Sequence, residues 1–355
     1  MKKSFLRISF AGALLSVALY LGLTEAPIDP AAYLPRPAPP LLGLLAPNHA
    51  LTQAGLLAKG QIHGPEDMAI DGTGEIYTGT GDGKIIRIRR DESVETFAET
   101  GGRPLGLQFD RHGNLIVADA VKGLLSISRE SIITTLTTSA EGVPFKLTDA
   151  MDIAGDGRIY FSDASSKWRQ SEYLYDLLEA KPYGRLLCYD PATQSTTAVM
   201  RDLYFANGVA LSQDEDFVLV NETYRYRIAR HWLKGEKAGT SEVFIDNLPG
   251  FPDGISSNRR GTFWLALFTV RNPIMDHLHP YPFAKKILSR LPKLFWPKPK
   301  PYGLVLALDE QGRVQRSLHD PTGKHLFEIT SAREHEGFLY CGTLDYDRIG
   351  KYKLE

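Results

Sequence analysis

Short stretches of alternating apolar and polar residues recur in pairs from about residue 64, and a turn rich in Asp, Gly and Asn separates the two members of each pair. Residues 64–79 form one such pair, and residues 102–119 repeat its pattern. Alternation on both sides of a Gly-containing turn is typical of a β-hairpin. The sequence therefore predicts a succession of hairpins.

The same phrase returns in six copies, and most copies are followed by a third apolar segment. The later copies begin at Thr148, Ala206, Pro252 and, in reduced form, Ile329. Most intervals between them approach the ~40 to 50 residues of a four-stranded blade. The pattern predicts an all-β fold, a six-bladed β-propeller over residues 55–355, with insertions in the third and fifth blades. A β-sandwich, the alternative, does not explain the recurrence.

The N-terminus carries a different pattern. Lys2, Lys3 and Arg7 precede an apolar run over residues 8–23, which is typical of a segment that enters a membrane. Residues 24–26 match a cleavage site poorly, which favours an N-terminal hydrophobic helix retained as a membrane anchor over residues 1–26. Secretion after signal cleavage is the alternative. With the basic residues inside, the rest of the chain is expected on the extracytoplasmic side, periplasmic or lumenal.

Residues 27–54 contain seven prolines and predict a stiff, extended linker. Further along, Asn221-Glu-Thr is a glycosylation sequon if the chain passes through a eukaryotic secretory route.

Composition narrows the function classes. The 41 basic and 42 acidic residues give a formal net charge of -1, which argues against a nucleic-acid partner. Two cysteines exclude a disulfide scaffold and a four-cysteine zinc site. Because Cys188 and Cys341 fall in the third and sixth blades, we expect them to be too far apart to bridge.

A propeller brings the residues that open each repeat toward one axis, because the innermost strand of every blade starts beside the central tunnel. Those residues are Glu66, Leu105, Asp149, Asn207 and Asp253. Four of the five offer oxygen donors, and three are carboxylates that repel one another unless a cation lies between them. All-oxygen ligation favours Ca²⁺. Alternatively, Asn207-Gly208 and Asp253-Gly254 are turn formers.

The chain from about residue 55 resembles the strictosidine synthase-like branch of the SMP-30, gluconolactonase and paraoxonase superfamily of calcium-dependent phosphotriesterase-like propellers. The motifs that carry the resemblance begin at Gly64, Phe161, Phe205, Asn221, Leu248 and Phe263. The resemblance implies that Glu66, Asn207 and Asp253 stand where the hydrolases hold catalytic calcium. It also implies that Asp149 replaces the Asn usual in those enzymes.

Two departures from the family pattern bear on mechanism. Asp149 adds a negative charge, which either tightens calcium binding or supplies a proton acceptor. Leu105 stands where the resemblance to paraoxonases would place a catalytic His, so the base must come from elsewhere. In the plant condensing enzymes a glutamate of the last blade is the base, and Glu328 resembles it. The alternative for Glu328 is a solvated carboxylate at a strand edge.

These residues predict a membrane-anchored, calcium-dependent hydrolase of esters or lactones, with the metal polarising the carbonyl of a small, lipophilic substrate. The catalytic candidates are Asp149 and Glu328, and the metal candidates are Glu66, Asp149, Asn207 and Asp253. A strictosidine synthase-like condensing enzyme, or a binding propeller without catalysis or metal, is the alternative. The chain has no Gly-x-Ser-x-Gly, Walker-type or His-Glu-x-x-His motif.

The fifth-blade insertion, residues 272–300, contains a predicted amphipathic helix over residues 282–291. One face carries Phe283, Ile287, Leu288 and Leu291, and the other carries Lys285, Lys286 and Arg290. Three roles are open: a lid over the tunnel mouth, a helix that lies on lipid beside the anchor in the region 282–296, and an ordinary amphipathic helix packed against the propeller.

Overall fold

The computed structural model describes residues 25–354. Almost all of the expected anchor, residues 1–24, therefore lies outside the described part. Within residues 25–354, no helix has the length and apolar character needed to cross a membrane. The chain forms two compact units: a small one from residues 25–35, 174–181 and 272–298, and a large one from the remainder.

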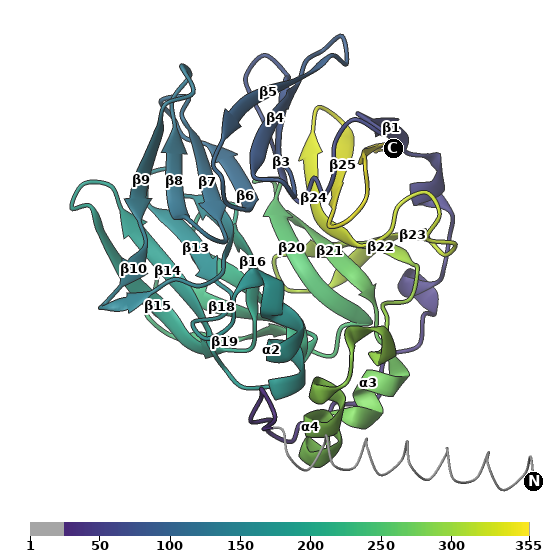
Figure 1. Cartoon of the computed structure of the whole chain (residues 1–355). Helices are drawn as coiled ribbons and strands as arrows, with labels where there is room; N and C mark the ends of the chain where they lie inside the picture. The colour runs from purple at the N-terminus through teal and green to yellow at the C-terminus, as the bar shows by residue number, and fades with distance from the viewer. Residues whose placement is uncertain (1–24, 355) are drawn as a thin grey trace, which may run out of the picture. The chain divides into compact units, whose positions relative to one another are not determined.

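The large unit contains six four-stranded antiparallel sheets (Figure 1). The first two are β2 (Met68–Ile70), β3 (Ile76–Gly79), β4 (Lys84–Ile88), β5 (Val94–Glu99) and β6 (Pro104–Phe109), β7 (Leu115–Asp119), β8 (Gly123–Ile127), β9 (Ile133–Thr137). The next two are β12 (Thr148–Ile153), β13 (Ile159–Asp163), β14 (Gly184–Asp190), β15 (Ser195–Leu203) and β16 (Ala206–Leu211), β17 (Phe217–Glu222), β18 (Arg227–Trp232), β19 (Ser241–Ile245). The fifth is β20 (Gly250–Ser257), β21 (Thr262–Val270), β22 (Gly303–Asp309), β23 (Val314–Asp320). A short hairpin, β10 (Ser139–Ala140) and β11 (Val143–Pro144), follows β9.

The sixth sheet joins the two ends of the propeller sequence. Its order is β24 (Ile329–His335), β25 (Phe338–Thr343), β26 (Ile349–Lys353) and then β1 (Gly55–Leu57), with Gly55 opposite Lys351. The innermost strands contact one another in the order β2, β6, β12, β16, β20, β24 and back to β2. The predicted all-β, six-bladed propeller is confirmed.

The blades pack by burying both faces of their central strands. In β7, Leu115 and Val117 belong to an apolar core shared with the first blade, whereas Ile116 and Ala118 belong to one shared with the third blade. Successive side chains of a strand point to opposite faces, so a strand between two sheets must be apolar throughout. Cys188 and Cys341 lie in different cores, and both are free, as expected.

The innermost strands approach one another so closely that some positions require glycine. A Cβ on Gly208 would lie 2.5 Å from the carbonyl oxygen of Asp253, and one on Gly254 would lie 2.3 Å from that of Thr330. The glycine in Asn207-Gly208 and Asp253-Gly254 therefore reflects strand packing between blades.

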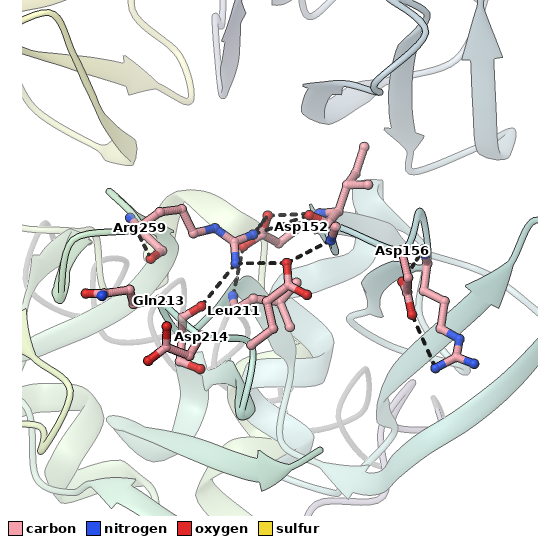
Figure 2. A network of polar contacts seen from close by, with 12 residues as sticks. Asp152, Asp156, Leu211, Gln213, Asp214 and Arg259 are labelled. Atoms are coloured by element: carbon pink, nitrogen blue, oxygen red, sulfur yellow. Dashed lines mark hydrogen bonds and ion pairs between the residues drawn. The ribbon is translucent and has the colours of Figure 1, made fainter. Parts of the chain in front are cut away.

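A polar network ties three blades together at the end of β12 that lies away from Asp149 (Figure 2). The carboxylate of Asp152 accepts hydrogen bonds from the Leu211 amide and the Arg259 guanidinium, both at 2.8 Å. Arg259 also donates to the Ser212 carbonyl at 3.1 Å. Because Asp152 is buried, the pair fixes the third, fourth and fifth blades in register.

Residues 36–54 belong to the expected linker, and they pack on the propeller. The segment forms η1 (Gly43–Leu45) and η2 (Ala50–Gln53). Leu51 is fully buried in the core of the sixth blade. Asn48 donates to the Ser317 carbonyl and accepts from the His319 amide. The prolines extend the backbone, and apolar burial holds it down.

The small unit is helical. Its helices are α2 (Tyr173–Glu179), which interrupts the third blade, and α3 (Pro273–Leu278), α4 (Pro282–Arg290) and η5 (Lys293–Phe295), which interrupt the fifth. Two further 3₁₀ turns, η3 (Gln170–Glu172) and η4 (Thr223–Arg225), belong to the large unit. Both insertions occur in the expected blades.

Both predicted faces of α4 can be examined in the packing of the small unit. Lys285, on the basic face, is fully buried, and its ammonium donates to the Ala31 carbonyl at 2.6 Å. Phe283, on the apolar face, is 76% exposed. The unit therefore does not hold α4 by its apolar face.

Candidate functional site

A pocket opens on the propeller axis where the innermost strands begin. Its empty volume is about 400 Å³. One residue from each blade lines it at the same repeat position: Glu66, Leu105, Asp149, Asn207, Asp253 and Thr330. The structure thus brings together all four oxygen donors predicted from the repeats. Leu105, the fifth predicted residue, lines the same pocket with an apolar side chain. Thr330 occupies the equivalent position in the sixth, reduced repeat, and its identity there was missed because the copy is degenerate.

In five blades the next residue along the chain also lines the pocket: Asp67, Gly106, Ala150, Gly254 and Ser331. Asp67 adds another carboxylate. The Asp67 carboxylate accepts from the Leu107 amide and the Arg333 guanidinium, both at 3.2 Å. Asp67 is therefore compensated by a cation from the sixth blade.

The three remaining carboxyls lie in a field that disfavours their ionisation. Burial raises the pKa of Asp149 well above its usual value, and the Glu66 charge raises it further, against a smaller opposing effect of Arg103. Burial likewise raises the pKa of Asp253, and the charges of Glu66 and Asp149 add to the shift. The charge of Glu66 thus opposes the ionisation of both aspartates, and that of Asp149 opposes the ionisation of Asp253.

Glu66 has a partner that the repeat analysis missed. Arg103, which is 8% exposed, places its guanidinium 3.0 Å from the Glu66 carboxylate and also donates to the Gly64 carbonyl at 3.0 Å. Burial raises the pKa of Glu66 and the Arg103 charge opposes this. Arg103 belongs to the second repeat, residues 102–119, but the sequence does not reveal that its side chain points toward Glu66 of the first blade.

Hydrogen bonds from neighbouring blades hold the backbone of the site. The hydroxyls of Thr330 and Ser331 both donate to the Glu66 carbonyl at 2.7 Å. The Asn221 amide donates to the Asp253 carbonyl at 2.5 Å. Since Asn221 is fully buried in β17, the sequon marks a positioning residue and is closed to a glycosyltransferase in the folded chain.

The chemical types of the donors fit a hard cation, because they are carboxylate and amide oxygens, and a positive charge between the carboxyls would reduce their repulsion. The side chains are not already arranged as a metal site. Among residues 25–354, no group of three or more His, Cys, Asp or Glu side chains is gathered as metal ligands are. The ion pair with Arg103 already engages one of the three axial carboxyls.

Glu328, the other catalytic candidate, lies just before β24 and does not line the axial pocket. It is 9% exposed, which contradicts the alternative of a solvated carboxylate. Burial raises the pKa of Glu328 to about 7, with a further contribution from the Asp345 charge. Its carboxyl can therefore exchange a proton near neutral pH.

Tyr173 connects the electrostatic environment of Glu328 to that of the pocket. Burial raises the pKa of Tyr173 to about 12, and the charges of Asp345, Glu328, Glu66 and Asp253 follow in that order. The Tyr173 phenol therefore lies within the electrostatic field of Glu328 and also within that of the axial carboxyls Glu66 and Asp253. No motif in the sequence singles it out.

Comparison with known proteins gives matches over most of the chain. The family model for strictosidine synthase matches residues 149–236, and that for the strictosidine synthase-like N-terminal region matches residues 43–88. The adipocyte plasma membrane-associated protein of Rattus norvegicus is 37% identical over 99% of this chain and 98% of its own length. Strictosidine synthase-like protein 6 of Arabidopsis thaliana is 39% identical over 89% of this chain and 85% of its own.

Among solved structures, a gluconolactonase from Xanthomonas campestris superposes with a TM-score of 0.63, covering 94% of this chain and 99% of its own. The two chains are 17% identical, so the likeness shows a shared fold.

Proposed function

Since the chain belongs to the strictosidine synthase-like family, we propose that it is a membrane-anchored, calcium-dependent hydrolase of esters or lactones, similar to arylesterases and lactonases. The observation that carries this proposal is the axial pocket, in which Glu66, Asp149 and Asp253 are buried beside Asn207 and the charge of Glu66 raises the pKa of both aspartates. A divalent cation bound among these carboxyls would lower the free energy of the site. The shared fold of a gluconolactonase supports a lactone as substrate class.

Calcium would be held by the oxygens of Glu66, Asp149, Asn207 and Asp253. When bound, it would draw electron density from the carbonyl oxygen of an ester or lactone and favour attack on the carbonyl carbon. Of these residues, Asn207 favours the ionised form of Asp253 and lowers its pKa, against the larger effect of burial. Arg103 fixes the direction of Glu66.

Proton transfer falls to the chain's own carboxyls. Asp149, which lines the axial pocket, would accept a proton from water as the water oxygen bonds to the carbonyl carbon. The proton would then pass to the leaving alkoxide oxygen when the ester bond breaks, which returns Asp149 to its starting state. Glu328, with a pKa of about 7, lies outside the lining of that pocket and is the second candidate for this role.

The proposed location is the extracytoplasmic face of a membrane, with residues 1–26 as the anchor. The similarity to a protein named for its association with the adipocyte plasma membrane supports this part of the proposal. A lipophilic small molecule is then the expected substrate, because the site works beside a bilayer. Protease protection of the chain in sealed membranes tests the orientation.

The decisive experiment is a screen of aryl esters and lactones with the purified chain after chelation and after calcium is restored. We expect hydrolysis to disappear with chelator and to return with calcium. Asp253→Asn should abolish the calcium-dependent turnover, and Asp214→Asn, at an exposed surface carboxylate, should leave it unchanged. Turnover that survives chelation, or that is unaffected by Asp253→Asn, contradicts the proposal.

A second candidate is a strictosidine synthase-like condensing enzyme or a binding propeller that needs no metal. The Arg103–Glu66 ion pair favours it, since Arg103 supplies a positive charge inside the cluster. In that case thermal unfolding is the same with calcium and with chelator. A calcium site filled at ~100 times its dissociation constant would instead stabilise the fold by about 2.7 kcal/mol.

A further inference from the structure

Helix α4 of the small unit turns a polar face inward. Lys285 is fully buried, and Ser289, one turn later on the same face, is 4% exposed. The Lys285 ammonium is held by the Ala31 carbonyl at 2.6 Å. In a helix of a water-soluble domain, these inward positions are normally apolar.

The opposite face of α4 carries the apolar residues. Phe283 is 76% exposed, and Ile287 lies one turn further along the same side of the helix. Lys286 and Arg290 lie three and seven residues after Phe283, along one side of it on the helix surface. An aromatic ring directed to solvent beside basic residues is typical of a helix at the boundary between water and lipid.

The exposed apolar character extends beyond α4. Six of the thirteen large hydrophobic side chains exposed in the described chain belong to this small unit. We call them the interfacial set: Leu34 (82% exposed), Ile274 (66%), Tyr281 (64%), Phe283 (76%), Leu294 (73%) and Phe295 (65%). Such a concentration of exposed apolar groups marks a contact surface of some kind.

The charges of the fifth-blade insertion favour an anionic partner. In the fifth-blade insertion, Lys286, Lys293 and Lys298 accompany the interfacial set, and Asp276 is the sole acid. The Lys286 ammonium lies 3.6 Å from the Asp29 carboxylate, and the Lys286 side chain is 41% exposed. Basic residues beside exposed aromatic and aliphatic groups match the headgroups and the acyl boundary of an anionic leaflet.

The course of the chain points to the same occupant. Ile28, which is 3% exposed, and Ala31 are packed in the small unit, and the apolar run of residues 8–23 precedes Ile28 by only a few residues. A segment of this composition partitions into a bilayer. The linker between it and the small unit is too short to carry the unit far from the membrane surface.

We propose that the interfacial set is a second membrane contact, by which the small unit lies on a leaflet that contains anionic lipid. Phe283, Leu294 and Phe295 enter the acyl boundary, while Lys286 and Lys293 reach the headgroups. The contact is independent of calcium and of any catalytic activity.

The test places an environment-sensitive fluorophore on the full-length chain through Phe283→Cys or Phe295→Cys. The two native cysteines are buried and are replaced by Ser if they react. The labelled protein is reconstituted in vesicles of phosphatidylcholine and phosphatidylserine with and without doxyl-labelled lipid. A label at Val121→Cys, an exposed apolar position of the propeller, is the control.

We expect emission at 283 and 295 to shift to the blue and to lose about half of its intensity to shallow doxyl groups, with neither change at 121. Joint Lys286→Glu and Lys293→Glu changes should reduce the quenching at 283, whereas Lys324→Glu on the propeller should not. Quenching at 283 and 295 no greater than at 121 overturns the proposal. A blue shift that grows with protein concentration and resists lipid quenchers also overturns it, because the partner is then a second copy of the chain.

Discussion

The Arg103 guanidinium lies 3.0 Å from the Glu66 carboxylate, although the two residues open different blades of the propeller. This contact places a fixed positive charge beside the carboxyls of the axial pocket. Any divalent cation that enters must share Glu66 with Arg103, so the arginine sets how strongly the site attracts metal.

The first prediction concerns that competition. Arg103→Gln should tighten calcium binding about tenfold, because it removes a like charge from the neighbourhood of the ion. Isothermal titration calorimetry at neutral pH measures the change, with Arg313→Gln on the surface as the matched control. Weaker binding in Arg103→Gln would mean that Arg103 acts mainly by orienting Glu66.

The second prediction concerns the stability of the metal-free protein at different pH. The pKa values of Asp149 and Asp253 are raised in the fold, chiefly by burial, so these carboxyls stabilise the fold while protonated. This contribution is complete below their unfolded pKa of about 4 and is lost as pH rises through the folded values.

In urea unfolding with chelator, the contribution of these two carboxyls to the free energy of unfolding should therefore fall as pH rises above about 4. Asp253→Asn should flatten this part of the profile, and Asp214→Asn should leave it unchanged. An identical slope in the wild-type chain and Asp253→Asn would show that the axial carboxyls do not govern it.

The third prediction has the opposite sign and a different location. Burial lowers the pKa of His319 to about 4, and the neutral ring lies between the Tyr302 hydroxyl at 2.9 Å and the Ser317 hydroxyl at 2.8 Å. The unfolded chain binds a proton at His319 near pH 6.5 and the folded chain does not. Stability is therefore lost as pH falls from about 6.5 to about 4.

His319→Gln should remove that acid-side loss at a cost of about 1 kcal/mol at neutral pH for the altered hydrogen bonds. Denaturant unfolding across the acid range measures both effects, and His112→Gln, at an exposed ring, is the control. If the acid-side loss persists in His319→Gln, other groups must cause it.

The fourth prediction concerns the tie between blades in Figure 2. Arg259→Ala should lower the free energy of unfolding by about 2 kcal/mol, because it leaves the buried Asp152 carboxylate without its cation. Arg313→Ala removes a comparable pair whose arginine is 71% exposed, and it should cost less than about 1 kcal/mol. Equal losses in the two variants would show that the network adds nothing beyond a surface pair.

Much of the fold is readable from the sequence because its signals are local. The unbroken apolar run at residues 115–118 is typical of a strand buried on both faces, and the recurring turn marks where each hairpin reverses. Once six copies are recognised, propeller geometry places Glu66, Asp149, Asn207 and Asp253 at one end of the axis, as the structure does. Asn221 is an example of what the sequence does not reveal. Its three-residue motif does not indicate that the Asn221 amide donates a hydrogen bond to the Asp253 carbonyl.

The sequence by itself determined the number of blades, the position of each insertion and the identity of the axial oxygen donors, since all three follow from periodicity along the chain. Only the tertiary structure decided that Arg103 pairs with Glu66 and that α4 buries Lys285 and exposes Phe283. A helical pattern states which residues share a face, but not which face meets the rest of the unit. Contacts between side chains of different blades depend on distances across the axis, and no local pattern encodes those distances.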